Sequence, residues 1–180
     1  MTHPGFLQTA IFRYFSVITL SLMTCFLSSC SNLSSFLFYP KKHYYQYPEQ
    51  LGLTAERVTI KTQDDETLVN WFLKSPVEAK GTILFLHGNG ENISTHINSV
   101  AWLPKYGYEV FLLDYRGYGE SSGTSTLASA LQDIDHAHRW LSARQASLPL
   151  FVLGQSMGGA LGITYTAQYD KNLNKIAALI

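Results

Sequence analysis

The sequence contains little that would indicate a disulfide, a metal site or a nucleic-acid partner. Its 180 residues include only two cysteines, and thirteen basic side chains are balanced by thirteen acidic ones. Basic residues form no run, which argues against binding of nucleic acid. No spacing of metal ligands and no phosphate-binding loop is present, so we expect no cofactor. The proportions of 46% hydrophobic and 14% charged residues are typical of a globular domain with one core.

Charge is also scarce in the N-terminal part of the chain. Arg13 is the only charged side chain before Lys41, and the apolar run 14–27 follows it. A basic start, a short apolar stretch and small residues before a cleavage point predict a secretory signal peptide over residues 1–29. The alternative is an uncleaved signal anchor, although this run is shorter than the roughly 20 apolar residues that a spanning helix needs.

The end of this segment resembles the lipobox of bacterial lipoproteins, because Leu27–Ser29 directly precede Cys30. The resemblance implies cleavage before Cys30, which then carries acyl chains such as palmitate and anchors the protein to a membrane. Cys25 would leave with the signal peptide, so the mature chain would keep no thiol for a disulfide. Ser31 follows the cysteine, at the position where lipoproteins retained in the inner membrane usually have aspartate, so the resemblance implies sorting to the outer membrane. We therefore expect a lipid-anchored protein of the bacterial cell envelope, on the periplasmic face of the outer membrane.

Residues 30–50 are expected to form a tether between the lipid and the domain. They include Lys41, Lys42 and several tyrosines, without the period of a helix or a strand. The aromatic rings could lie among lipid headgroups, where amphipathic rings are favoured. The interpretation that we favour is that the segment packs on the outer surface of the domain. The tyrosines concerned are Tyr39, Tyr44, Tyr45 and Tyr47.

From residue 51 to the end, apolar strand-like runs alternate with helical segments after an initial hairpin. This alternation predicts an α/β domain with a mostly parallel sheet and helices on both faces. The first strand alternates polar and apolar residues, as an edge strand does, while the later strands are continuously apolar and so predicted to be buried. The expected strands are 57–61, 67–73, 82–86, 108–114, 150–153 and 176–180, and the expected helices are 92–106, 126–144 and 160–169.

The stretch Gly154–Gln155–Ser156–Met157–Gly158 lies between an apolar strand and a helical segment. A turn this sharp leaves no room for side chains at Gly154 and Gly158, and it projects the hydroxyl of Ser156 away from the strand. The N–H groups that begin the following helix point to the same place. The pattern predicts a nucleophile elbow with Ser156 as the nucleophile. The alternative is a glycine-rich turn with an N-capping serine.

Three motifs, in this order, resemble the α/β-hydrolase superfamily, most closely its monoacylglycerol lipase and serine aminopeptidase-like branch. They are His87–Gly90, Asp114–Ser122 and Gly154–Gly158. The resemblance covers residues 51–180 and implies the α/β-hydrolase fold. It also implies a serine hydrolase that cleaves an ester, thioester or amide bond of a small-molecule or lipid-like acyl substrate through an acyl-enzyme.

The same resemblance assigns roles to individual residues. Ser156 is the expected nucleophile, and the backbone N–H groups of Met157 and Asn89 are expected to form the oxyanion hole. Gly88 and Gly90 would let their loop approach the substrate closely.

The neighbouring polar residues receive structural or peripheral roles. His87 is expected to brace the oxyanion loop rather than to act as the base, and Asp114 and Arg116 are expected to tie the loop after the fourth strand. The candidates to line the entrance are Glu91, Asn92 and His96.

The chain departs from the family in its triad. On this fold the serine is followed by an acid and then a histidine. After Ser156 the sequence has one carboxylate, Asp170, and no histidine, while His136 and His138 are interpreted as surface or packing residues of a helix. A serine without a general base is a poor nucleophile. We therefore expect that the catalytic acid and histidine are absent from this chain and that it is truncated after the sixth strand. The alternative is a non-catalytic hydrolase-like remnant or binding protein.

Overall fold

The computed structural model describes residues 37–145, 147–173 and 176–180. The predicted signal peptide and Cys30 lie outside the described residues. One compact unit spans Phe38–Ile180. No helix in this described part of the chain combines the length and the apolar character needed to cross a bilayer.

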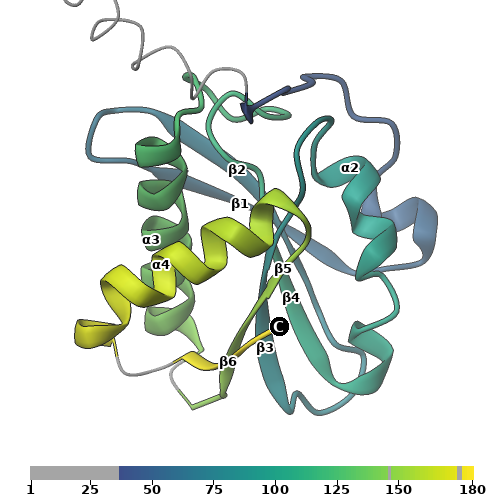
Figure 1. The fold of residues 1–180 in the computed structure, drawn as a ribbon. Coiled ribbons are helices and arrows are strands. Elements are labelled where there is room, and N and C mark those ends of the chain that lie inside the picture. Colours follow the sequence, from purple (N-terminus) through teal and green to yellow (C-terminus); the bar gives the residue numbers. More distant parts are fainter. Residues whose placement is uncertain (1–36, 146, 174–175) are drawn as a thin grey trace, which may run out of the picture. The chain divides into compact units, whose positions relative to one another are not determined.

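Six strands form one sheet in the order β1-β2-β4-β3-β5-β6 (Figure 1). The first two strands make the predicted antiparallel hairpin, and β2 also runs antiparallel to β4. Strands β4, β3, β5 and β6 are parallel to one another, so the prediction of a mostly parallel sheet is confirmed. The bounds are Ala55–Lys61 (β1), Thr67–Leu73 (β2), Gly81–Leu86 (β3), Tyr108–Leu113 (β4), Leu150–Gly154 (β5) and Ile176–Leu179 (β6).

Two long helices, α3 (Leu127–Arg144) and α4 (Met157–Leu173), cover one face of the sheet (Figure 1). Helix α3 begins after Thr126, whose hydroxyl accepts a hydrogen bond from the N–H of Ser129 and so satisfies one of the free donors at the helix start. The apolar side of α3 packs on the sheet, as its sequence period predicts. Its buried apolar residues are Ala130, Leu131, Ile134, Ala137 and Leu141.

The opposite face is covered by shorter elements, and the predicted helix over 92–106 is wrong in its extent. Only Ile93–His96 (α2) is α-helical, and it is followed by 3-10 turns at Ile97–Ser99 (η3) and Pro104–Tyr106 (η4). Proline has no amide hydrogen for the helical ladder, which favours interruption at this point. Gly107 ends the segment with φ 90°, as predicted. The segment still buries Ile93, Ile97, Val100 and Leu103 against the sheet.

The last two strands are less buried than the sequence predicts. In β5, Leu150 and Val152 face α4 and are buried, whereas Phe151 and Leu153 on the other face are only half-buried. Strand β6 has no fully buried residue. The physical reason is its place at the edge of the described sheet, where neighbouring elements cover its two faces less completely than those of the central strands.

Residues 38–50 pack along the domain. The N–H of Lys41 donates to the carbonyl of Glu91 (3.1 Å), and the N–H of Gly119 donates to the carbonyl of Lys41 (2.9 Å). Tyr44 is buried and packs edge-on against Trp71, with ring centroids 5.1 Å apart. Three neighbouring tyrosines remain exposed: Tyr39, Tyr45 and Tyr47.

Candidate active site

The site is built where β3 and β5 end side by side. Leu86, the last residue of β3, pairs with Gly154 of β5, and the N–H of Gln155 donates to the carbonyl of Leu86 (2.9 Å). From β3 the chain crosses to β4 on one side and then returns to β5 on the other, so the loops leave this point in opposite directions. In open α/β sheets such a switch point is where ligands bind.

The turn after β5 has the geometry of a strained elbow. Ser156 is exposed and has φ 54°, a left-handed conformation that side chains seldom adopt. A Cβ at Gly158 would lie 2.0 Å from the carbonyl oxygen of Leu86, and a Cβ at Gly154 would lie 2.5 Å from the Cα of Gly159. The prediction that neither glycine position has room for a side chain is confirmed.

Helix α4 starts directly after the serine, one turn earlier than the sequence predicts. The N–H groups of Gly158 and Gly159 donate to the carbonyls of Gln155 and Ser156, both at 2.9 Å. The N–H of Met157 has no backbone acceptor among the described residues. The first amides of a helix have no partner within it, and this one therefore remains available beside Ser156.

The loop after β3 lies against this elbow. A Cβ built on Gly88 would lie 3.5 Å from the Cβ of Ser156, an ordinary contact, so the two backbones are close neighbours. Asn89 is exposed, and its side-chain oxygen accepts from the N–H of Tyr39 and of Gly90, both at 2.8 Å. These bonds engage the side-chain oxygen. The backbone N–H of Asn89 has no backbone acceptor among the described residues. Gly90 has φ 81°, which glycine adopts without strain.

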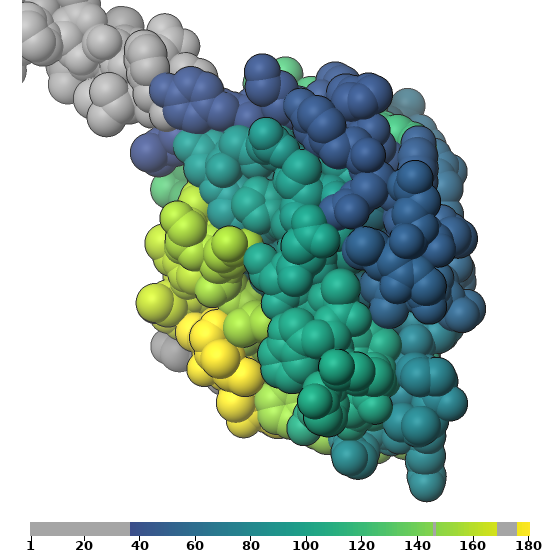
Figure 2. Space-filling model, turned by 90° about the vertical axis from the view of Figure 1, so that its right-hand side faces the viewer, coloured from purple at the N-terminus to yellow at the C-terminus, as the bar shows by residue number. Residues whose placement is uncertain are grey.

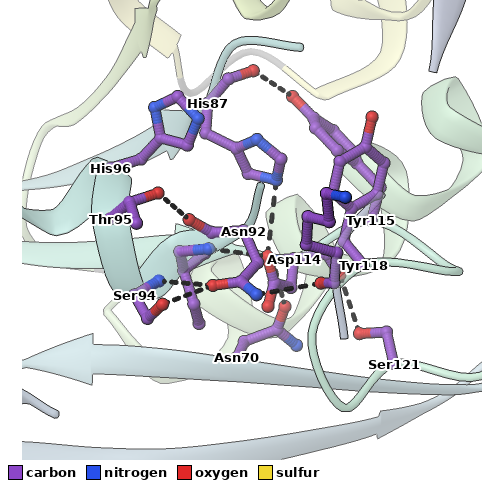
Figure 3. Close-up of polar contacts among 12 residues, drawn as sticks. Asn70, His87, Asn92, Ser94, Thr95, His96, Asp114, Tyr115, Tyr118 and Ser121 are labelled. Carbon is purple, nitrogen blue, oxygen red and sulfur yellow. Dashed lines mark hydrogen bonds and ion pairs between the residues drawn. The ribbon is translucent and has the colours of Figure 1, made fainter. Parts of the chain in front are cut away.

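His87 is fully buried beneath the loop (Figure 3). Its Nδ1 lies 2.7 Å from the carbonyl oxygen of Gly88, and its Nε2 lies 3.4 Å from Oδ1 of Asp114. The ring also packs on Tyr115 and Tyr118, at centroid distances of 4.7 and 4.9 Å. His87 is therefore a brace for the loop, as predicted.

Asp114 connects the two sides of the site. Its Oδ1 accepts from the N–H of Ile93 (2.9 Å), which fixes the start of α2, and its Oδ2 accepts from the hydroxyl of Tyr44 (3.0 Å). Burial and the charge of Asp114 raise the pKa of Tyr44 well above its ordinary value, so this phenol remains a donor. The structural role of Asp114 was predicted from the sequence, but its hydrogen bond with Tyr44 was not. A contact between residues 70 positions apart leaves no local pattern in the sequence.

Arg116 and Asp133 form a buried pair behind the site. The guanidinium donates to Asp133 from Nε (3.0 Å) and Nη2 (2.8 Å), and the backbone N–H of Arg116 adds a third bond at 2.8 Å. Burial raises the pKa of Asp133, an effect that the hydrogen bonds from Arg116 oppose. Hydrogen bonds from Thr62 and Arg116 lower the pKa of Asp64 to about 2. The pair anchors the loop after β4 to helix α3.

The three residues predicted to line the entrance have different positions. Glu91 is exposed, with φ 56°. Asn92 is fully buried, and the prediction is wrong for it: its amide donates to the carbonyls of Lys41 and His43 and its oxygen caps α2. The acceptors at Lys41 and His43 hold the side chain inward, away from solvent.

His96, the last residue of α2, contacts the elbow directly. Its Nδ1 is 3.1 Å from Oε1 of Gln155 and its Nε2 is 3.3 Å from the carbonyl oxygen of Gly90. Its ring stacks on His87, at 5.0 Å and 22° (Figure 3). His96 therefore joins the loop after β3 to the elbow after β5.

The other candidates for a triad lie elsewhere. His138 of α3 is buried, with Nδ1 2.8 Å from the hydroxyl of Tyr165, which agrees with a packing role. Asp170 falls within α4. In the part of the chain that the structure describes, no group of three His, Cys, Asp or Glu could hold a metal ion.

Comparison with known proteins places this geometry in a family. The sequence profile of the family described as serine aminopeptidase, S33, matches residues 77–180. The chain is 37% identical to the protein YfhR of Escherichia coli (strain K12) over 132 residues, which are 70% of the chain and 45% of YfhR. It is 33% identical to the lysophosphatidylserine lipase ABHD12 of Macaca fascicularis over 123 residues, which are 64% of the chain and 31% of that lipase. The chain thus spans less than half the length of these two relatives.

A solved structure supports the fold. The esterase Pf2001 of Pyrococcus furiosus superposes with a TM-score of 0.67 at 23% identity, covering 79% of this chain and 54% of the esterase. The predicted α/β-hydrolase fold is therefore confirmed for the described domain. On its sequence and its fold, the chain belongs to the serine aminopeptidase (S33) family of the α/β-hydrolase superfamily.

Proposed function

We propose that the protein is a serine hydrolase that cleaves an ester, thioester or amide bond of a small-molecule or lipid-like acyl substrate, with Ser156 as the nucleophile. The observation that carries this proposal is the conformation of Ser156, an exposed non-glycine residue at φ 54° between two positions that accept only glycine. A fold retains such strain mainly at functional sites. The hydroxyl would attack a carbonyl carbon and form an acyl-enzyme that water then hydrolyses.

The oxyanion hole of the proposed reaction consists of the backbone N–H groups of Met157 and Asn89. Both are free of backbone acceptors in the described residues; one begins helix α4 and the other belongs to the loop after β3, and these two segments meet at Ser156. Donors fixed in advance stabilise the charge that develops on the carbonyl oxygen in the transition state, and loss of one typically lowers kcat about 10²- to 10³-fold.

A non-catalytic hydrolase-like protein is the second candidate. The observation that favours it is that, among the described residues, no histidine contacts the hydroxyl of Ser156; His96 contacts Gln155 and Gly90 instead. The two candidates differ in one measurable property, the reactivity of the serine hydroxyl.

The proposed location is the bacterial cell envelope, with the protein attached to a membrane by acyl chains on Cys30. Support comes from the sequence, in which Arg13, the apolar run 14–27 and the small residues before Cys30 follow the order of a lipoprotein signal. Several acyl chains on one residue give stable attachment, where a single chain gives only reversible binding.

One preparation tests both parts of the proposal. The protein, expressed from its own gene and extracted from membranes, is treated with a fluorophosphonate, digested and analysed by mass spectrometry. We expect the phosphonate on the peptide that contains Ser156 and acyl groups on an N-terminal Cys30. An unmodified Ser156 would favour the non-catalytic candidate, and a Cys30 peptide without acyl groups would remove the anchor.

Substitution of His96 by phenylalanine tests the proposed oxyanion hole. The variant keeps a ring that can stack on His87 but loses the contacts to Gln155 and Gly90. Because the two N–H donors would then be less well fixed, we expect kcat for an ester substrate to fall roughly 10-fold with KM little changed.

The matched control for this experiment is His136→Phe, a histidine on α3 that makes no contact with the elbow among the described residues. Its kcat should equal that of the wild type. A change in KM alone for His96→Phe would indicate that His96 binds substrate instead of holding the donors in place.

A further inference from the structure

Most of the large exposed aromatic side chains belong to two segments that are neighbours on one surface of the domain. The space-filling view shows this side, with the segment that starts at residue 38 along the top and right and the segment around residues 95–107 in the centre (Figure 2). We call its large exposed residues the aromatic face: Tyr39, Tyr45, Tyr47, Leu51, Trp102 and Tyr106.

Hydrogen bonds hold the first of these segments against the loop after β3 and against helix α2. The N–H of Tyr39 donates to the side chain of Asn89, and the N–H of Tyr45 donates to Oγ of Ser94 (3.0 Å). A hollow of about 420 Å³ lies between Leu51 and Trp102. The rings of Trp102 and Tyr106 are in contact, at a centroid distance of 5.7 Å.

The composition of the face suits a bilayer surface. Tyrosine and tryptophan have an apolar ring with a polar tip, and such side chains concentrate at the boundary between hydrocarbon and water. Lys105 lies with Nζ 5.2 Å from the ring of Tyr106, and Lys41 is exposed between the tyrosines, so both can meet lipid phosphates. Glu49 and Glu91 are also exposed and balance these two lysines in number, so the rings carry the expected affinity.

The chain length before the domain limits the distance to the membrane. Cys30 and Phe38 are eight positions apart in the sequence. Fully extended at about 3.6 Å per residue, this stretch spans no more than about 29 Å. If Cys30 carries the lipid anchor, Phe38 at the start of the domain therefore lies within about 29 Å of the anchored residue. The aromatic face begins at the next residue, Tyr39.

We propose that the aromatic face docks on the lipid bilayer surface and directs the loop after β3, with the elbow next to it, toward the lipid. Tyr39 connects the two, because it belongs to the face and bonds Asn89 of that loop. This inference rests on the proposed hydrolase function, which it deepens by assigning the acyl substrate to the membrane, and the proposed anchor at Cys30 adds to its support.

The tryptophans supply the test. Trp102 is 52% exposed, whereas Trp71 is buried and Trp140 is half-buried. The full chain is reconstituted in vesicles of phosphatidylethanolamine and phosphatidylglycerol, with or without brominated acyl chains. We expect brominated lipid to quench the emission that is lost in Trp102→Phe, and aqueous iodide to leave that emission unquenched.

A tryptophan placed on another side of the domain is the matched control. In the Trp102→Phe background, Ile163→Trp puts a ring at a position of α4 that is 62% exposed. Iodide should quench this tryptophan and brominated lipid should not. Equal quenching at both positions by brominated lipid would overturn the docking orientation.

The remaining outcomes separate docking from anchoring. Trp102 quenched by iodide and not by brominated lipid overturns docking, even if Cys30 carries acyl groups. Trp102 shielded from both quenchers also overturns it, because a protein would then cover the face. Quenching by brominated lipid without acyl groups on Cys30 supports docking and refutes only the anchor.

Discussion

Replacement of Ser156 by alanine is expected to lower the rate of ester hydrolysis by the native gene product roughly 10⁴- to 10⁶-fold. Without the hydroxyl no acyl-enzyme can form, and only binding and the oxyanion hole remain. The side chain is exposed and the backbone φ of 54° is as accessible to alanine as to serine. The circular dichroism spectrum should therefore match that of the wild type. The free energy of unfolding should stay within about 1 kcal/mol of the wild-type value.

The measurement is kcat/KM for a p-nitrophenyl ester, together with fluorophosphonate labelling of both proteins. Ser147→Ala is the control, since Ser147 is an exposed serine at the opposite end of β5. It should keep full activity. If Ser156→Ala hydrolysed the ester as fast as the wild type, Ser156 would not be the nucleophile.

Replacement of Asp133 by alanine is expected to lower the free energy of unfolding by about 3 to 5 kcal/mol. The side chain of Asp133 has no exposed surface and that of Arg116 is only 6% exposed. Without Asp133, the guanidinium keeps only Asp64 at its outer end, and the backbone N–H of Arg116 loses its acceptor. A buried charge that keeps only this half-exposed partner, and a buried donor left without an acceptor, both destabilise a fold strongly.

Urea unfolding followed by circular dichroism measures this loss. Arg139→Ala removes a charge from the same helix, where Arg139 is 65% exposed and pairs with Asp135 four residues earlier. That exposed pair should contribute no more than about 0.5 kcal/mol. In a double-mutant cycle, Arg116→Ala should cost much less in the Asp133→Ala background than in the wild type. Additive effects would show that the two side chains do not stabilise each other.

A part of the candidate site could be predicted from the sequence when all of its residues lie in one short segment. The elbow is such a segment, because the strand, the two glycines and the helix start are consecutive and each is demanded by local geometry. The bracing role of His87 was implied by the family resemblance of the motif His87–Gly90, and its contacts with Gly88 and Asp114 agree with that role. The inward position of Asn92 could not be predicted, because it depends on acceptors at Lys41 and His43.

Some features of the fold had no local signal. The run 92–106 has enough apolar residues for a helix, yet tertiary packing and Pro104 divide it into one α-helical turn and two 3-10 turns. The partial exposure of β5 and β6 depends on which elements cover each face of the sheet. Hydropathy along the chain does not predict this coverage.

The sequence by itself determined the succession of strands and helices and the turn chemistry at Ser156, because hydrophobic period and glycine requirements act over a few residues. Only the tertiary structure decided the strand order β1-β2-β4-β3-β5-β6, which brings the loop after β3 against the elbow after β5. It also decided the contacts of His96 and Tyr44, which join positions 59 and 70 residues apart. Such contacts depend on how whole elements pack, and packing is settled by the sum of many weak interactions across the core.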